Sequence, residues 1–189
     1  IVIAGLWQLL DDPVEGLDFV GRLLGAQGRV LPMSTDPLSI EADMNDNGRR
    51  YTVKGQSKVA IAAGDVEAVR LSPEEPKVPA AVTDAISEAD WVVLGPGSWY
   101  TSVIPHLLVP DLHRALVTTE AHRALILNLE RQRGETESMT TADHVRAIAQ
   151  YAPSFKLDVV IADPTTTDDI DDLAEAADAL GARVLLRQV

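Results

Sequence analysis

One stretch of the sequence combines glycines with hydroxyl side chains in the way that anion-binding turns do. It follows the apolar residues 91–94 and reads Gly95, Pro96, Gly97, Ser98, Trp99, Tyr100, Thr101 and Ser102. Glycines let a ligand approach the backbone, and N–H groups and hydroxyls at the start of a helix stabilise a phosphate. The alternative is an ordinary turn between a strand and a helix, capped by Ser98. A single Gly-x-Gly motif does not decide between the two interpretations.

A second group of polar side chains follows the apolar residues 124–127. It begins with Asn128 and continues with Glu135 and Thr136. An amide such as that of Asn128 has both a donor and an acceptor, so it suits a base or a sugar hydroxyl, although it also caps loops. Glu135 and Thr136 are either ligand contacts or solvated loop residues.

Asp143 and His144 stand in the first turn of a predicted helix. Together they could hold a metal ion or move a proton. The helix dipole alone also favours Asp143 at this position, and a histidine at a helix start is more often simply exposed. The sequence therefore assigns neither catalytic residues nor metal ligands.

Arg187 is the only basic residue after Arg183 and directly follows the apolar residues 184–186. A guanidinium at the end of a parallel strand can bind a diphosphate or a carboxylate through two hydrogen bonds. The alternative is a surface residue that only offsets the charge of the acidic segment before it.

The composition is that of an aliphatic globular protein. Hydrophobic residues make up 46% of the 189 positions, and 16 basic against 29 acidic residues give a net charge of −13. This charge argues against a broad surface for nucleic acids or anionic membranes, so an anionic ligand needs a local positive site. The sequence has no cysteine, and no apolar run reaches the roughly 18 residues of a membrane span. We therefore expect a cytoplasmic protein without membrane insertion, and leave open whether it forms a homo-oligomer.

Helices and strands alternate in the second half of the chain, where the candidate residues lie. Strands are predicted, between helical segments, at residues 91–94, 124–127, 157–161 and 183–186. This alternation implies right-handed crossovers and a parallel sheet whose carboxyl ends share one edge. Ligands bind at that edge in open α/β sheets. Residues 91–94 lack polar alternation, which predicts a strand buried on both faces.

The first half is richer in β-structure. Helical patterns at 1–10 and 14–24 precede a short strand predicted at 29–31. Residues 38–54 alternate around Asn47-Gly48, which is the strongest hairpin signal in the sequence. A further strand is predicted at 66–71.

These patterns predict a single α/β domain over residues 1–189, with a β-rich front at 29–71 and a βα back at 79–189. A proline-rich linker, residues 73–79, separates the two parts. The chain starts inside a helical pattern without an N-cap, so we expect it to be a fragment of a larger domain.

Two ordered motifs carry a family resemblance. The first is Gly95-Pro96-Gly97-Ser98-x-Tyr100-Thr101-Ser102-x-x-Pro105-x-Leu107-Leu108-Val109-Pro110, and the second is Asn128-x-x-x-Gln132-x-Gly134-Glu135-Thr136-x-x-x-Thr140-x-x-Asp143-His144. Both resemble the 2-phospho-L-lactate transferase-like superfamily, and more closely its bacterial branch, the gluconeogenesis factors. The likeness extends more loosely from Ala4 to about Arg187. The chain departs from the family pattern at His106, Glu130, Arg133 and Ser138.

The resemblance implies a Rossmann-like, mostly parallel sheet with helices on both faces and a hairpin insertion near residues 38–54. The family opens with a Gly-rich strand-loop-helix that binds nucleotide phosphates, and nothing in this sequence matches it. The implied function is a regulatory protein that binds a nucleotide sugar such as UDP-N-acetylglucosamine, linked to carbon metabolism, cell shape and cell-wall precursor supply. The alternative is a transferase that moves 2-phospholactate from a nucleotide carrier onto a deazaflavin alcohol with Mg²⁺. Few basic residues lie near the expected site, which favours the binding protein.

Overall fold

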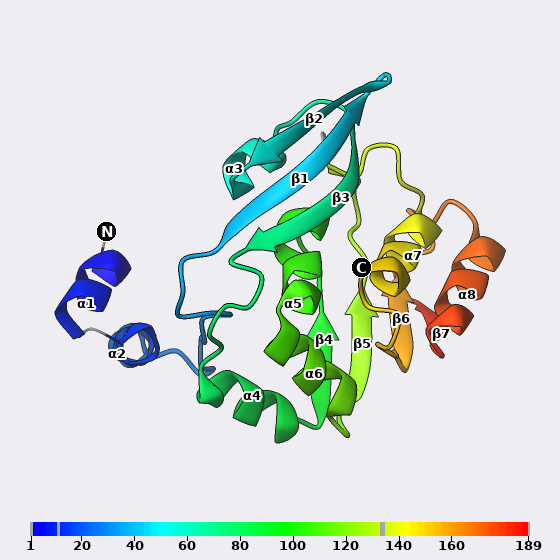
Figure 1. The fold of residues 1–189 in the computed structure, drawn as a ribbon. Helices are drawn as coiled ribbons and strands as arrows, with labels where there is room; N and C mark the ends of the chain where they lie inside the picture. Colours follow the sequence, from blue (N-terminus) through cyan, green and yellow to red (C-terminus); the bar gives the residue numbers. More distant parts are fainter. Residues whose placement is uncertain (1, 11, 133–134, 189) are drawn as a thin grey trace.

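The computed structural model describes residues 2–10, 12–132 and 135–188 (Figure 1). No described helix is both long and apolar enough to pass through a lipid bilayer. In chain order the elements are α1 (Val2–Leu10), α2 (Pro13–Leu24), β1 (Ser39–Asp46), β2 (Arg49–Lys54), α3 (Gln56–Val59), β3 (Asp65–Ser72), α4 (Ala80–Ser87), β4 (Trp91–Leu94), the π-helical turn η1 (Trp99–Val103), α5 (Ile104–Leu108), α6 (Pro110–Thr118), β5 (His122–Ile126), α7 (Thr141–Tyr151), β6 (Val159–Ala162), α8 (Ile170–Ala179) and β7 (Arg183–Leu186).

The larger sheet contains four parallel strands in the order β4-β5-β6-β7. Leu94 of β4 is aligned with Leu125 of β5, which is aligned in turn with Val160 of β6. Because the strands all run in one direction, their carboxyl ends meet at one edge of the sheet. The predicted α/β class and parallel sheet are therefore confirmed.

The helices that connect these strands lie on one face of the sheet. The strands follow one another in sequence order, and right-handed crossovers then place every connecting helix on the same side. In the view of Figure 1, α6 and α7 lie in front of the sheet. On the opposite face of β4, the side chains of Trp91 and Val93 are 54% and 52% exposed.

One prediction about this sheet therefore needs correction for the described residues. Residues 91–94 were expected to be buried on both faces, but β4 pairs only with β5 and forms the edge of the sheet. An uninterrupted apolar run indicates that a strand is hydrophobic, but it does not indicate which strands or helices pack against it.

The smaller sheet is antiparallel, with the strand order β2-β1-β3. Asn47 and Gly48 form the turn between β1 and β2 with positive φ angles of 50° and 90°. Positive φ at both central positions is what a two-residue hairpin turn requires, so the predicted hairpin is confirmed. The strand predicted at 66–71 joins the other side of β1 as β3.

The hydrophobic core lies between the two sheets and the helices that join them. Met44 of β1, Ile104 of α5, Leu125 of β5 and Ile148 of α7 are all fully buried in it. Burying one such side chain contributes roughly 1.5–3 kcal/mol, so this shared core fixes the small sheet relative to the large one.

At the amino end, the start and the end of α2 are set by capping residues that the sequence contains. The Asp12 carboxylate accepts hydrogen bonds from the N–H groups of Val14 and Glu15, and Gly25 ends α2 in the left-handed conformation. The strand predicted at 29–31 is wrong, because these residues find no strand partner. Arg29 instead forms an ion pair with Asp18 of α2 at 2.7 Å.

Candidate functional site

The two motif stretches contact each other at the carboxyl edge of the parallel sheet. The loop after β4 contains Gly97, and the loop after β5 begins near Asn128. The N–H of Gly97 donates to Asn128 Oδ1 at 2.8 Å, and Asn128 Nδ2 donates to the Gly97 carbonyl at 2.7 Å. Both polar atoms of the amide are therefore engaged by one backbone unit, which ties the two loops together.

Glu135 is held on the N–H groups that the sequence offers to a phosphate. Its carboxylate accepts from the Ser98 hydroxyl and the Tyr100 N–H, each at 2.8 Å, and from the Thr101 N–H at 2.9 Å. The residue is only 6% exposed. Free N–H groups at the start of a helical segment favour a negative charge, and here an internal carboxylate supplies it.

Gly95 is required by the neighbouring strand. It has a φ of 72°, and a Cβ at this position would lie 2.4 Å from the carbonyl oxygen of Ile126 in β5. Glycine at this position therefore has a packing reason that is independent of any ligand. Gly97 is less crowded, because the nearest atom to a Cβ there is Ser102 Cβ at 4.0 Å.

Tyr100 and Thr101 are buried side chains at the start of η1, and each is under 10% exposed. Burial raises the pKa of the Tyr100 phenol to about 12, so this group stays protonated at neutral pH. Its hydroxyl donates to the sulfur of Met139, which lies on the second loop. Tyr100 therefore adds a further contact between the two motif stretches.

Thr136 and Asp143 also form hydrogen bonds within the protein. The buried Thr136 hydroxyl accepts from the Gln132 N–H at 3.0 Å. Asp143 forms a capping box with Thr140, in which each side chain accepts from the backbone N–H of the other residue. Two residues of the second motif region, Arg133 and Gly134, lie outside the described residues.

His144 is buried, whereas the sequence favoured an exposed position. It is 6% exposed, and its Nδ1 lies 2.7 Å from the carbonyl oxygen of Thr140. The ring contacts the indole of Trp99 edge-on, with 5.0 Å between the ring centroids. Burial lowers the pKa of His144 below its ordinary value. The first turn of α7 covers the ring from one side and η1 covers it from the other, which local sequence does not reveal.

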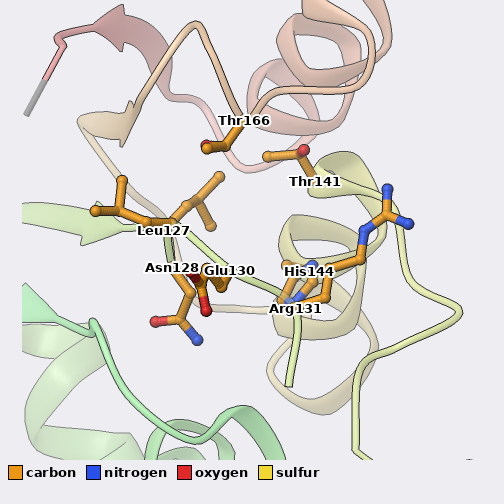
Figure 2. A pocket seen from close by; sticks show the side chains of 8 residues that line it. Leu127, Asn128, Glu130, Arg131, Thr141, His144 and Thr166 are labelled. Carbon is orange, nitrogen blue, oxygen red and sulfur yellow. The ribbon is translucent and has the colours of Figure 1, made fainter. Parts of the chain in front are cut away.

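A polar pocket opens between the carboxyl ends of β5 and β6, beside the start of α7 (Figure 2). Its volume is about 320 Å³, including the part open to solvent. It is lined by Leu127, Asn128, Leu129, Glu130, Arg131, Thr141, His144 and Thr166. Asn128 and His144 are thus the two predicted site residues that the pocket brings together.

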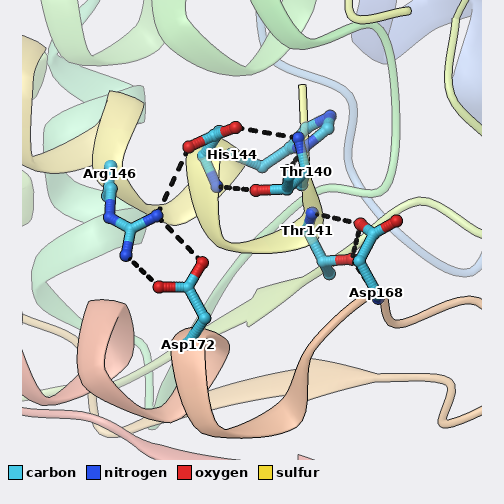
Figure 3. Close-up of polar contacts among 7 residues, drawn as sticks. Thr140, Thr141, His144, Arg146, Asp168 and Asp172 are labelled. Atoms are coloured by element: carbon cyan, nitrogen blue, oxygen red, sulfur yellow. Dashed lines mark hydrogen bonds and ion pairs between the residues drawn. The ribbon is translucent and has the colours of Figure 1, made fainter. Parts of the chain in front are cut away.

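An ion pair borders this pocket. Arg131 of the loop after β5 binds the Asp168 carboxylate of the loop after β6. Asp168 also accepts from the Thr141 N–H at 2.8 Å and from the Thr141 hydroxyl at 2.9 Å (Figure 3). The hydrogen bond from the Thr141 N–H, together with the Thr141 hydroxyl and Arg131, lowers the pKa of Asp168 and outweighs burial, which acts in the opposite direction. The positive charge of Arg131 is therefore already neutralised within the protein.

Sequence reasoning missed Arg131, Thr141 and Thr166 as pocket residues. Thr166 follows β6 as Asn128 follows β5, so the shared carboxyl edge was the signal that could have indicated it. Thr141 adjoins the capping box, and Arg131 adjoins Gln132 of the second motif. Neither spacing indicates that the two side chains face one pocket.

The remaining predicted residues lie elsewhere along the sheet edge. Arg187 is exposed at the end of β7, which is separated from β4 by two strands. Its backbone N–H donates to the Ala162 carbonyl at 2.9 Å. A separate apolar groove of about 910 Å³ beside β4 is lined in part by Gly95, Pro96 and Ser102.

No metal-binding cluster forms in the described part of the chain. Groups of three or more His, Cys, Asp or Glu side chains with suitable geometry are absent from these residues. The pair Asp143 and His144 therefore lacks a third ligand of this kind, and the capping box already engages Asp143.

We expect acid to destabilise the protein through His144. In the unfolded chain its pKa is about 6.5, and burial makes the folded value lower. Below pH 6.5 the unfolded state therefore binds this proton more readily, so the free energy of unfolding falls as the pH falls. Urea titrations at pH 7.5 and 5.5 measure the free energy of unfolding. Between these two pH values His144→Gln should lose less of it than the wild type does. Equal losses would contradict a buried, neutral His144.

Comparison with known proteins relates this fold to one family. The profile of the family described as "2-phospho-L-lactate transferase CofD" matches residues 1–182. A Mycobacterium tuberculosis protein named "Putative gluconeogenesis factor" is 47% identical over 167 residues, which cover 86% of this chain and 49% of that protein. A "Gluconeogenesis factor" from Listeria innocua is 31% identical over 166 residues, or 88% of this chain and 51% of that protein. The chain thus spans about half the length of these relatives.

A solved structure has the same fold. The crystal structure of a UPF0052-family protein from Bacillus halodurans superimposes with a TM-score of 0.86 at 28% sequence identity. The match covers 99% of this chain and 64% of the other.

Proposed function

Because the chain belongs to the 2-phospho-L-lactate transferase CofD family, in which its relatives are named gluconeogenesis factors, we propose that it is a nucleotide-sugar-binding regulatory protein. The ligand is a uridine diphosphate sugar of the type of UDP-N-acetylglucosamine. The regulatory role lies in carbon metabolism, cell shape and the supply of cell-wall precursors.

The polar pocket between β5 and β6 carries this proposal. It lies at the sheet edge where open α/β folds bind ligands. Thr141 and Thr166 contribute hydroxyls to its lining, and His144 contributes a neutral imidazole. Neutral donors and acceptors of this kind suit sugar hydroxyls. The enclosed part of the pocket is only about 30 Å³, so it can hold a single hydroxyl-sized group of a nucleotide sugar and leaves the rest of the ligand on the open sheet edge.

A panel of ligands tests the proposal by thermal unfolding. The panel contains UDP-N-acetylglucosamine, UDP-glucose, UDP, free N-acetylglucosamine and ADP-glucose. A ligand at a hundredfold its Kd adds about 2.7 kcal/mol to the free energy of unfolding. The two UDP-sugars should raise the melting temperature most, UDP less, and the other compounds least. No shift with either UDP-sugar would contradict the proposal.

Arg187 is the residue that we propose to bind the diphosphate. It lies at the carboxyl end of β7, its side chain is exposed, and it forms no ion pair with the described residues. Its only hydrogen bond among the described residues is a long one, from Nη1 to the Leu186 carbonyl oxygen at 3.5 Å, and a guanidinium can bind two phosphate oxygens at once.

Reversing the charge of Arg187 should abolish nucleotide-sugar binding. Arg187→Glu puts a repulsive charge beside the diphosphate, while an exposed charge contributes at most about 1 kcal/mol to folding. Calorimetric titration should therefore lose its signal while the melting temperature of the free protein changes little. The matched control is Arg183→Glu at the other end of the same strand, which should bind normally. Equal affinities in the two variants would remove Arg187 from the site.

The family description supports a second candidate, a transferase acting on 2-phospholactate. The described residues offer no three-ligand cluster for Mg²⁺, although Mg²⁺ is often held by one or two carboxylates together with substrate phosphates. Incubation with the nucleotide-linked 2-phospholactate, the deazaflavin alcohol and Mg²⁺, followed by mass spectrometry, separates the two functions. Formation of the phosphodiester product would favour the transferase.

A further inference from the structure

The protonation state of His144 follows from its hydrogen bond. Nδ1 lies 2.7 Å from the Thr140 carbonyl oxygen, which can only accept. Nδ1 must therefore carry the proton. In a neutral ring, Nε2 is then a bare acceptor.

The imidazole of His144 is neutral despite the carboxylates around it. Asp143 and Asp168 favour the charged form of His144, and Arg131 disfavours it. Glu130 adds a further carboxylate to the pocket lining. Asp143 is held by the capping box and by Arg146, and Asp168 is held by Arg131 and Thr141. Burial outweighs these carboxylates, and the pKa of His144 is lowered.

Nε2 forms no hydrogen bond with any residue that the structure describes, and His144 lines the polar pocket. The neighbouring hydroxyls are already donating, since Thr141 donates to Asp168 and Thr166 donates to the Asp163 carbonyl. A phosphate cannot complement a bare acceptor, because a phosphate also mainly accepts. The complementary group is a hydroxyl that donates.

We propose that His144 binds a sugar hydroxyl of the ligand, and that its Nε2 accepts a hydrogen bond from that hydroxyl. This inference rests on the proposed function and adds to it that the sugar and the phosphates of the ligand are bound by different residues. The pocket beside α7 selects the sugar, while the phosphates are bound elsewhere on the sheet edge. His144 is thus a specificity-determining residue of the binding site.

His106 provides an internal control for a spectroscopic test. Its Nδ1 also lies 2.7 Å from the carbonyl oxygen four residues earlier, that of Ser102. It is exposed and lies outside the polar pocket. The two histidines therefore share the same local bond and differ in burial and in access to the pocket.

Nitrogen-15 NMR of the histidine rings, with UDP-N-acetylglucosamine and with UDP, tests the inference. We expect the Nε2 resonance of His144 to move when the sugar nucleotide binds and to stay in place with UDP. The resonance of His106 should stay in place with both. The affinity for UDP-N-acetylglucosamine should fall by up to about tenfold per pH unit below the pKa of His144, because protonated Nε2 no longer accepts. The affinity for UDP should depend less on pH.

Two negative outcomes are distinguishable. If UDP-N-acetylglucosamine binds but leaves the His144 resonance and the pH dependence unchanged, the inference is wrong and the proposed function stands. If no UDP-sugar binds at all, the proposed function fails and the role of His144 fails with it. Neither readout depends on whether a substituted protein folds.

Discussion

Replacing Gly95 by alanine is expected to destabilise the protein by about 2–5 kcal/mol. The new Cβ would lie 2.4 Å from the Ile126 carbonyl oxygen, and relieving such overpacking costs about 1–3 kcal/mol. The left-handed φ of 72° adds about 1–2 kcal/mol for a residue with a side chain. Urea unfolding monitored by circular dichroism measures the loss.

Gly28→Ala is the matched control for this substitution. Gly28 lies in the segment after α2, and a Cβ there would meet no atom within 4 Å. Its free energy of unfolding should change by less than about 1 kcal/mol. If Gly95→Ala were as stable as Gly28→Ala, the close approach of β4 and β5 at this turn would be wrong.

Removing the carboxylate of Glu135 is expected to cost about 3 kcal/mol or more. Glu135→Ala leaves the N–H groups of Tyr100 and Thr101 without their acceptor, and it leaves the Ser98 hydroxyl with only the Thr101 hydroxyl as a partner. An unsatisfied buried donor costs about 1–3 kcal/mol, and bonds to charged groups are at the upper end of the range. Glu135→Gln keeps one oxygen acceptor and should lose less.

The control is Glu137→Ala, two residues further along the same loop. Glu137 is exposed, so its removal should change the free energy of unfolding by no more than about 0.5 kcal/mol. Equal stabilities of Glu135→Ala and Glu137→Ala would show that the internal carboxylate does not hold the turn after β4. The N–H groups of that turn would then be free for an external anion.

Local chemistry in the sequence was enough to predict much of the fold. Asn47-Gly48 specified the hairpin turn, because few other pairs adopt positive φ twice in succession. Gly25 ended α2 for a similar reason. The alternation of apolar strands with helical segments predicted the parallel sheet and the edge at which the polar residues gather.

The contacts within the site could not be predicted in this way. The motifs placed Asn128 and Glu135 near the glycine turn, but spacing does not say whether a polar side chain faces a ligand or another loop. In the structure both side chains bond to the turn itself. The burial of His144 depends on Trp99, which is 45 positions earlier in the chain, and such long-range packing leaves no local signal.

The exposure of one face of β4 also could not be predicted from the local sequence. The run Trp91-Val92-Val93-Leu94 is equally apolar on both of its faces. Only the order of the strands shows that the connecting helices cover one face.

The most direct test of the account is a calorimetric titration of UDP-N-acetylglucosamine into the wild type, Thr166→Val and Thr118→Val. Both threonines are exposed and donate to a nearby carbonyl, but only Thr166 lines the polar pocket. One hydrogen bond contributes about 0.5–1.5 kcal/mol, so Thr166→Val should weaken binding about two- to tenfold, while Thr118→Val should bind as the wild type does. Equal affinities in all three proteins, or no binding to the wild type, would contradict a sugar site between β5 and β6.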